Sequence, residues 1–337
     1  MAFTRSATPY APPLAAGLPT RNGPAVALMV VAMALFAMDD ALIKLASALP
    51  GGASPGQAIA FHGTVGALVF GLMMLRSGAR ITRDLLTDRA VLARTFGDVI
   101  AVCGFVTALT LMPLGNASAI LQVQPLVVTL GAALLLGERV GWRRMAAILA
   151  GFVGVLVIIR PGLAGFTPVS GLVLIGVAGL AIRDLATRVV KARHSTAAIS
   201  TVVCVAIVPP GIALHAALGT GPLTAMDAEA VGALALASAF GTIGYWCITQ
   251  AARLGEVSAI APFRYSRLVF AILLGWIVFR EVPDGPMIAG SLMVVVAGAY
   301  ALRRERTAGT AAPGTARAAA PGMARAAAPD SRSADQR

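Results

Sequence analysis

The stretch GFVTALTLMPLGNASAI at residues 104–120 returns 140 residues later as GYWCITQAARLGEVSAI at residues 244–260. The two copies align without a gap and share the first glycine, a Leu-Gly pair and a Ser-Ala-Ile triplet. Each copy continues through an apolar run to a glutamate, Glu138 in the first and Glu281 in the second. A duplicated and mostly apolar chain is typical of membrane transporters whose substrate site lies between the two halves.

The composition places the chain in the membrane class. It has 337 residues, of which 58% are hydrophobic and 12% are charged, whereas soluble domains carry about 25% charged residues. The formal net charge of +12 does not predict a nucleic-acid partner, because the basic residues lie in short gaps between apolar runs and in the tail. That placement matches the excess of Lys and Arg in cytoplasmic loops, so we expect a lipid bilayer as the surroundings.

The apolar runs predict an all-α membrane protein with ten transmembrane helices, since a span needs about 20 apolar residues. The predicted spans are residues 25–46, 57–75, 95–112, 117–137, 143–160, 169–190, 197–218, 230–251, 257–279 and 286–303. Five spans per half is an odd number, so the second half must cross the membrane in the opposite sense to the first. We therefore predict two inverted five-helix repeats, an arrangement suited to opening alternately on either side.

The loops between the predicted spans differ in charge. Loops 47–56, 113–116 and 219–229 contain neither Lys nor Arg, whereas the alternate loops and the C-terminal tail are basic. Arg160 and Arg280 are the exceptions. Because basic residues are enriched in cytoplasmic loops, both termini are predicted to be cytoplasmic.

Four segments are predicted along the chain. They are an N-terminal segment at 1–24, a first repeat at 25–160, a second repeat at 161–306 and a cytoplasmic tail at 307–337. The tail repeats Ala-Pro-Gly-x-Ala-Arg-Ala-Ala-Ala-Pro and has no aliphatic side chain larger than Met. Such a composition cannot bury enough apolar surface to offset its ordering entropy, so we expect both terminal segments to be disordered.

Two longer stretches resemble a known family. They read LMPLGNASAILQVQPLVVTLGAALLLGERVGWRRMAAILAGFVGVLVIIRPG and APFRYSRLVFAILLGWIVFREVPDGPMIAGSLMVVVAGAY. Both resemble the EamA repeat of the drug/metabolite transporter superfamily, and the likeness extends over residues 25–305. The resemblance implies ten helices in two inverted repeats and movement of small metabolites across the bacterial inner membrane. The Ala-Pro-Phe-Arg-Tyr-Ser-Arg segment is most similar to members assigned to riboflavin or S-adenosylmethionine uptake.

Charged residues lie inside several predicted spans, where each costs about 2.5–3.5 kcal/mol near the bilayer centre. Asp40 and Lys44 in span one are spaced i, i+4, and so are Asp184 and Arg188 in span six, 144 residues later. This spacing puts acid and base on one helical face. The sequence leaves two interpretations open: ion pairs within one helix, with the basic side chains extending toward opposite surfaces, or parts of a functional site.

Other ionisable residues in the spans have no such partner. Asp39 has no basic residue four positions on, and we predict a proton-linked carboxylate there. His62, where many members of the similar family carry Arg, is either a hydrogen-bonded packing residue or a second proton-coupling group, because its unperturbed pKa lies near physiological pH. Asp98, near the start of span three, is expected to pair with the neighbouring Arg94.

Polar residues also gather on the equivalent spans four and nine. Arg264 and Arg267 lie three residues apart in span nine, and Gln124 holds the Arg264 position in span four. A proline near each site removes a backbone donor and leaves carbonyls free for a polar ligand. Arg264 either pairs with an anionic substrate, and with Asp39 or Asp40 when the site is empty, or extends to the cytoplasmic surface. The predicted substrate contacts on these spans are Gln122, Gln124, Arg264 and Arg267.

Aromatic and terminal residues complete the candidates. A stacking surface for a flat ligand is predicted from Tyr245, Trp246, Gln250 and Tyr265. For the tryptophan, anchoring at the membrane interface is the alternative. Glu138 and Glu281 are expected to end their spans at opposite membrane faces and to contact loops or gates.

No enzyme constellation is present in the sequence. The histidines at 62, 194 and 215 are widely separated, and there is neither a Gly-x-Ser-x-Gly elbow nor a phosphate-binding loop. The three cysteines fall inside apolar runs without metal-ligand spacing. We therefore expect no enzyme activity, no cofactor and no metal.

The leading hypothesis is a secondary transporter that moves a small polar metabolite or drug-like solute by alternating access, with protons as the coupling ion. A homodimer is compatible with it. The alternative is a non-transporting membrane sensor or scaffold, which needs an output module that the sequence does not contain. Deletion of residues 307–337 would separate the two, because a transporter keeps its activity without the tail. A membrane-embedded enzyme would need a reactive cluster at one depth.

Overall fold

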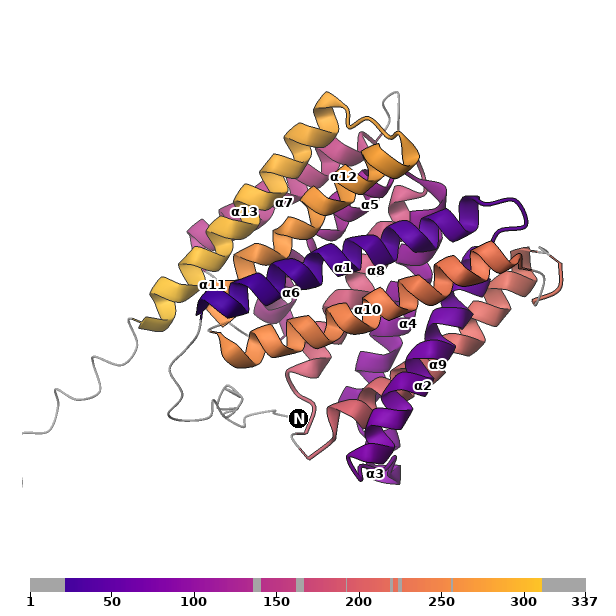
Figure 1. The fold of residues 1–337 in the computed structure, drawn as a ribbon. Helices are drawn as coiled ribbons and strands as arrows, with labels where there is room; N and C mark the ends of the chain where they lie inside the picture. The colour runs from indigo at the N-terminus through magenta and orange to yellow at the C-terminus, as the bar shows by residue number, and fades with distance from the viewer. Residues whose placement is uncertain are drawn as a thin grey trace, which may run out of the picture.

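The computed structural model describes residues 22–135, 141–161, 167–191, 193–218, 221–223, 226–255 and 257–310, and these ranges contain helices and no strand. Figure 1 shows long helices packed side by side, as the all-α prediction requires. The helices are α1 (Asn22–Ala48), α2 (Pro55–Arg76), α3 (Arg83–Thr87), α4 (Arg89–Leu111), α5 (Leu114–Leu121), α6 (Gln124–Leu135), α7 (Trp142–Ile159), α8 (Ser170–Thr187), α9 (Thr196–Leu218), α10 (Ala228–Leu254), α11 (Val257–Ile260), the 3₁₀-helix η1 (Ala261–Tyr265), α12 (Ser266–Phe279) and α13 (Gly285–Thr310).

The apolar runs and the helices correspond closely. Eight segments of the described chain are long and apolar enough to cross a membrane, and Met145–Ile159 and Gly285–Tyr300 are shorter apolar helices. The fifth and tenth predicted spans fall on these two shorter helices. The short helix α3 was not expected, and α13 runs to Thr310, into the segment expected to be disordered. The rest of that tail and residues 1–21 lie outside the described residues.

Several helices begin at side chains that satisfy free backbone donors. Ser54 and Gln57 form a reciprocal capping box at the start of α2, with Pro55 at its first position. Asp88 accepts a hydrogen bond of 2.9 Å from Ala90 N at the start of α4. These local signals fix where the loops end and the spans begin.

The helices pack mainly in pairs taken from opposite halves of the chain. α1 packs on α10, α4 on α8, α2 on α9, and α7 on α13, while α5 packs on α12. Glycines allow the close approach: a Cβ on Gly97 of α4 would lie 2.6 Å from the Gly179 carbonyl oxygen of α8, and the reverse distance is also 2.6 Å. Small residues at such crossings let backbones meet, which is how membrane helices associate.

Spans four and nine are both interrupted at the position where their prolines fall. Span four is divided into α5 and α6 at Gln122 and Val123, directly before Pro125. Span nine passes from α11 through η1, which contains Pro262, into α12. Since proline removes an amide donor and crowds the preceding turn, a proline near each break explains the interruption in both halves.

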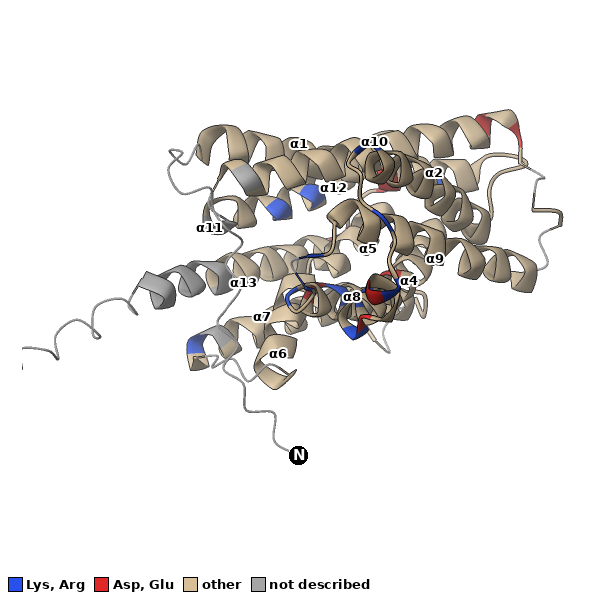
Figure 2. Cartoon of the chain, turned by 90° about the horizontal axis from the view of Figure 1, so that it is seen from below, with Lys and Arg blue, Asp and Glu red and all other residues tan. Residues whose placement is uncertain are grey.

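The loops define two ends of the bundle, which we name after the predicted orientation. At the outer end, the loop after α1 meets the start of α10 through Asp227 N and Gly51 O, 3.2 Å apart. At the inner end, the loop after α8 meets α3 through Arg193 and Asp84. Figure 2 shows α1 and α10 side by side, with α12 next to α1 and with α8 and α13 on the other side of α12.

Candidate functional site

The two interrupted spans contact each other where they break. The Gln122 side-chain amide, at the end of α5, donates a hydrogen bond of 3.2 Å to the Arg264 carbonyl oxygen in η1. A 3₁₀ turn at a helix break leaves carbonyls outside the regular ladder, and this one is satisfied from the other half. The breaks in the two halves therefore form one polar region inside the bundle.

Asp184 on α8 extends this region toward α6 and α4. It accepts a hydrogen bond of 2.8 Å from the Gln124 amide and lies 2.8 Å from the Arg183 guanidinium. Arg183 also lies 3.6 Å from Asp98 of α4. This corrects the expected pairing of Asp98 with Arg94, since Arg94 donates to Thr187 instead. The sequence analysis did not select Arg183. It could have been found from its repeat position, which is equivalent to that of Asp39 in the first half.

Asp40 on α1 forms an ion pair with Arg267 of α12. Arg267 donates from Nη2 and Nε to the same carboxylate oxygen, at 2.6 and 3.1 Å. Its guanidinium also lies over the rings of Phe36 and Phe105, at 5.6 and 5.7 Å from their centroids. The expected pairing of Asp40 with Arg264 is thus replaced by a pairing with the arginine one turn further on.

Lys44 does not pair with Asp40, its neighbour one turn earlier, but with Glu281 after α12. The two side chains are 2.5 Å apart, and Lys44 also donates to the Met112 carbonyl oxygen at 2.6 Å. The other oxygen of Glu281 accepts a hydrogen bond of 2.8 Å from Leu114 N, the first residue of α5. One carboxylate thus joins α1, α4, α5 and α12 at the outer end. Its predicted counterpart, Glu138, lies outside the described residues, and Arg188 is the C-terminal cap of α8.

Asp39 points to a different pair of helices from Asp40. Its Oδ1 lies 3.9 Å from Nδ1 of His62 on α2, and Ser238 Oγ on α10 lies 3.4 Å from the same nitrogen. Asp39 is 9% exposed, and its buried Oδ1 has no hydrogen-bond donor. The predicted proton-linked residues Asp39 and His62 are therefore neighbours, and Ser238 joins them without having been singled out in the sequence.

The side chain of Arg264 differs from the other arginines of the polar region. It is exposed, and within the part of the chain that the structure describes its guanidinium makes no hydrogen bond or ion pair. Tyr265 beside it is 5% exposed and packs against Gly298 of α13. Tyr245, in contrast, meets Phe70 edge to face, with 5.4 Å between ring centroids. The two tyrosines expected to share one stacking surface therefore lie in different places.

A cavity of about 750 Å³ opens beside Tyr245, between α2, α9 and α10. Its walls carry aromatic rings, hydroxyl groups and an amide, and the lining residues are free of charge. They include Phe70, Ser200, Thr242, Tyr245, Trp246, Thr249 and Gln250. Its size falls within the usual range for small-molecule sites, and it unites three of the four predicted stacking residues.

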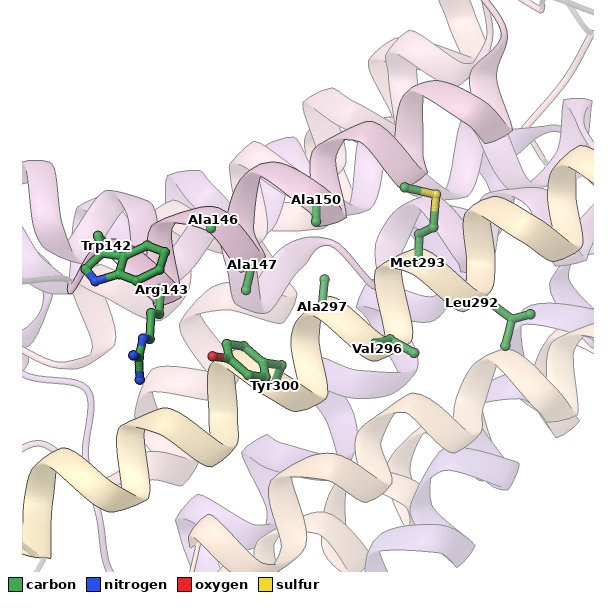
Figure 3. Close-up of a pocket in the computed structure, with 10 residues that line it drawn as sticks. All are labelled: Trp142, Arg143, Ala146, Ala147, Ala150, Leu292, Met293, Val296, Ala297 and Tyr300. Atoms are coloured by element: carbon green, nitrogen blue, oxygen red, sulfur yellow. The ribbon is translucent and has the colours of Figure 1, made fainter.

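A second hollow of about 630 Å³ lies between α7 and α13. Figure 3 shows small and aliphatic side chains along it, with Trp142, Arg143 and Tyr300 at one end. Aromatic and basic side chains beside an apolar helix surface are typical of a membrane interface. We therefore assign this hollow to the lipid-facing surface rather than to the polar interior.

Ion pairs at the inner end link α3 to the loop after α8. Arg193 donates a hydrogen bond of 2.5 Å to Asp84, and Lys191 lies 3.6 Å from the same carboxylate. The hydrogen bond from Arg193 lowers the pKa of Asp84 below its ordinary value. Asp88 lies beside them, 3.2 Å from His194.

A carboxyl group with a lowered pKa in the folded state stabilises the fold above its ordinary pKa, and this contribution is lost as the pH falls through the lowered value. We expect Asp84→Asn to reduce the thermal midpoint at neutral pH and to approach wild type as the pH falls below the lowered pKa of Asp84. Melting curves of the purified protein at neutral and at acidic pH measure this. An equal deficit at both would contradict it.

No group of three or more His, Cys, Asp or Glu side chains in the described ranges could hold a metal ion. The architecture is that of a multi-pass membrane protein made of two related halves around a polar interior. The chain belongs to the EamA-like transporter family, whose model matches residues 23–160 and 169–303.

Individual relatives carry transporter names. The riboflavin transporter of Brucella anthropi is 29% identical over 82% of this chain and 98% of its own length. The pseudopaline exporter of Pseudomonas aeruginosa is 29% identical over 81% and 93%, respectively. The S-adenosylmethionine uptake transporter of Rickettsia prowazekii is 24% identical over 59% and 66%. A crystal structure with 22% sequence identity shares the fold at a TM-score of 0.54, over 84% of this chain and 98% of that one.

Proposed function

We propose that this protein is a secondary transporter that carries a small polar solute across the bacterial inner membrane by alternating access, with protons as the coupling ion. The observation that carries the proposal is the meeting of two broken helices, one from each half, beside an arginine whose guanidinium makes no hydrogen bond or ion pair within the described ranges. Broken helices inside a bundle are how many secondary transporters bind polar solutes. The transporter names of the relatives support the same class. A homodimer remains a prediction, which light scattering of the protein in detergent tests.

The helix pairing supports two inverted halves of five spans each. Exchanging the halves turns the α1–α10 pair into the α8–α4 pair and leaves the α2–α9 and α7–α13 pairs in place. Such a contact pattern is expected when an internal axis relates the halves. With five spans per half, we propose that this axis lies in the membrane plane, so that the two ends of the bundle have similar structures and both termini are on one side. The basic loops favour the cytoplasm for that side.

The position of Arg264 favours a solute with an anionic group. Asp40 pairs with Arg267, whereas Asp98 and Asp184 share Arg183. Among the described residues, the Arg264 guanidinium makes no ion pair of its own. A guanidinium in the membrane interior binds a carboxylate or phosphate through paired hydrogen bonds. We therefore assign Arg264 to the anionic group of the substrate. Gln122 holds the backbone carbonyl of Arg264 in place, and Gln124 holds the carboxylate of Asp184.

The uncharged cavity beside Tyr245 suits a flat ring. Aromatic walls stack on planar ligands, and the neighbouring hydroxyl groups offer hydrogen bonds to ring heteroatoms. Riboflavin and S-adenosylmethionine, the solutes named in the relatives, both contain planar heteroaromatic rings. They are the first solutes to test with this protein.

We expect Arg264→Gln to reduce uptake of the transported solute into proteoliposomes by about 10- to 100-fold. The reason is that a hydrogen bond to a charged group contributes about 1.5–3 kcal/mol, and each 1.4 kcal/mol is about tenfold in affinity. Arg280→Gln is the matched control, because this exposed arginine follows the far end of α12. Its variant should transport like wild type.

Two results would refute the proposal. Wild-type protein that moves neither riboflavin nor S-adenosylmethionine nor any metabolite with a carboxylate or phosphate group, under an imposed pH gradient of either sign, would exclude transport of this class. Equal activity of the Arg264→Gln and wild-type proteins would exclude the assigned anion site.

A further inference from the structure

Asp39 is a buried carboxylate that the polar region leaves without compensation. Arg267 binds Asp40, the next residue, through two donors on one oxygen. The carboxyl group of Asp39 instead faces His62 of α2 and Gly241 of α10. Its Oδ1 has no donor. A buried ionised carboxylate without a partner is costly, so this group needs either a proton or a bound cation.

The equivalent position in the second helix pair carries different residues. With the repeat separations of 144 and 140 residues, Asp39 corresponds to Arg183, and Ser238 corresponds to Asp98. The α1–α10 and α4–α8 pairs are equivalent. In the second of them, Arg183 and Asp98 face each other at 3.6 Å as an ion pair. In the first, the cation is replaced by a carboxylate and the carboxylate by a hydroxyl.

Gly241 makes room for this substitution. A Cβ at this position would lie 2.9 Å from Asp39 Oδ2 and 3.2 Å from His62 Cε1. The carboxyl group and the imidazole therefore sit against the bare backbone of α10. Their separation of 3.9 Å is longer than a hydrogen bond, and a small shift of α2 would close it.

We infer that Asp39, His62 and Ser238 form the exchangeable proton site of this protein, and that the equivalent place in the other half is fixed as the Arg183–Asp98 ion pair. The carboxylate takes a proton from hydronium, which leaves water and a neutral carboxyl group, and returns it to water on the other side of the membrane. Ser238 holds the imidazole beside the carboxyl group. Asp40 and Arg267 neutralise each other beside the site, and α10 contributes a hydroxyl group and a glycine. The consequence, which rests on the proposed function, is one proton bound per transport cycle.

Infrared difference spectra between about pH 6 and pH 8 test the site without a substrate. The purified full-length protein is compared with Asp39→Asn and Asp98→Asn, which remove one carboxyl group each. We expect the carbonyl band of a buried protonated carboxyl group to change with pH in wild type and in Asp98→Asn, and to be absent in Asp39→Asn. A band that survives in Asp39→Asn, or that disappears only in Asp98→Asn, overturns the inference.

A charge exchange tests the comparison between the halves. Asp39→Arg combined with Ser238→Asp copies the Arg183–Asp98 pair into the first half. We expect the double variant to show no pH-dependent carboxyl band and to move solute at a rate independent of pH, whereas wild type changes by roughly tenfold or more over the same range. If the double variant does not fold, Asp39→Asn provides the same comparison. A pH-dependent rate in Asp39→Asn as large as in wild type overturns the inference.

The same measurements separate this inference from the proposed function. If wild-type protein shows the Asp39 band but moves no solute, the proton site is supported and the proposed transport function is refuted. If wild-type protein moves solute but shows no Asp39 band, the transport function is supported and the proton site is refuted.

Discussion

Asp40→Asn is expected to lower the free energy of unfolding by about 3–5 kcal/mol, the cost of leaving one charge of a buried pair alone. The side chains of Asp40 and Arg267 are 5% and 20% exposed, so water cannot replace the lost carboxylate. α1 would also lose its ionic contact with α12. Thermal unfolding of the purified protein in detergent measures the loss, and proteoliposome uptake should fall with it.

The double variant Asp40→Leu with Arg267→Met separates stability from function. Replacing both members of a buried pair by apolar side chains of similar volume is often neutral or stabilising, so the thermal midpoint should return while uptake stays low. Asp284→Asn is the control, because its side chain is 50% exposed and pairs with Arg160 near the surface. An unchanged midpoint in the single variant Asp40→Asn would show that the pair contributes nothing to the fold.

Lys44→Met and Glu281→Gln are expected to open the outer end of the bundle. The carboxylate of Glu281 holds both Lys44 and the amide of Leu114, and its neutral analogue keeps at most the second contact. Losing a charged hydrogen bond of about 1.5–3 kcal/mol shifts an open–closed equilibrium by roughly 10- to 100-fold. A cysteine at Asn116, which lines the hollow of about 300 Å³ beside Glu281, should then react faster with a membrane-impermeant maleimide.

The labelling uses a background in which the three native cysteines are replaced. Asp284→Asn again serves as the control, since it removes an ion pair from the same end without touching Lys44, and its rate should equal that of the parent. Equal rates in all variants would show that this ion pair does not close the outer end. Labelling of intact cells also tests the orientation, because an outer end that faces the cytoplasm would stay unlabelled.

Much of the fold could be predicted from short stretches of sequence. Hydropathy located the helices, because backbone groups in lipid must be bonded within the span. The breaks in spans four and nine were not predicted, although Pro125 and Pro262 lie beside them and proline acts on its own turn. The boundaries were less certain: α4 begins at Arg89 rather than at 95, since the polar first turn caps a helix that hydropathy alone would shorten.

The sequence named most residues of the candidate site, whose role in transport stays a prediction, but it did not give their pairing. The i, i+4 spacing of Asp40 and Lys44 suggested an ion pair within α1, yet both side chains bind residues of other helices. Residues four positions apart lie on the same face of a helix and can form an ion pair. Charged residues on neighbouring helices compete for these side chains, as Arg267 does for Asp40 and Glu281 does for Lys44. Arg183 and Ser238 belong to the site only because of contacts with other helices: Arg183 pairs with Asp98 of α4, and Ser238 contacts His62 of α2.

The sequence by itself determined a duplicated membrane chain, its spans, the prolines in two equivalent spans and the ionisable residues within the spans. These depend on hydropathy, proline chemistry and internal repetition, which act locally or compare the chain with itself. Only the tertiary structure decided which charges are neutralised and which are not. Arg267 meets Asp40 across 227 positions and Lys44 meets Glu281 across 237. Because helix packing assigns these charges, the Arg264 guanidinium is left without an ion pair among the described residues, and Asp39 has only His62 within ion-pair distance there.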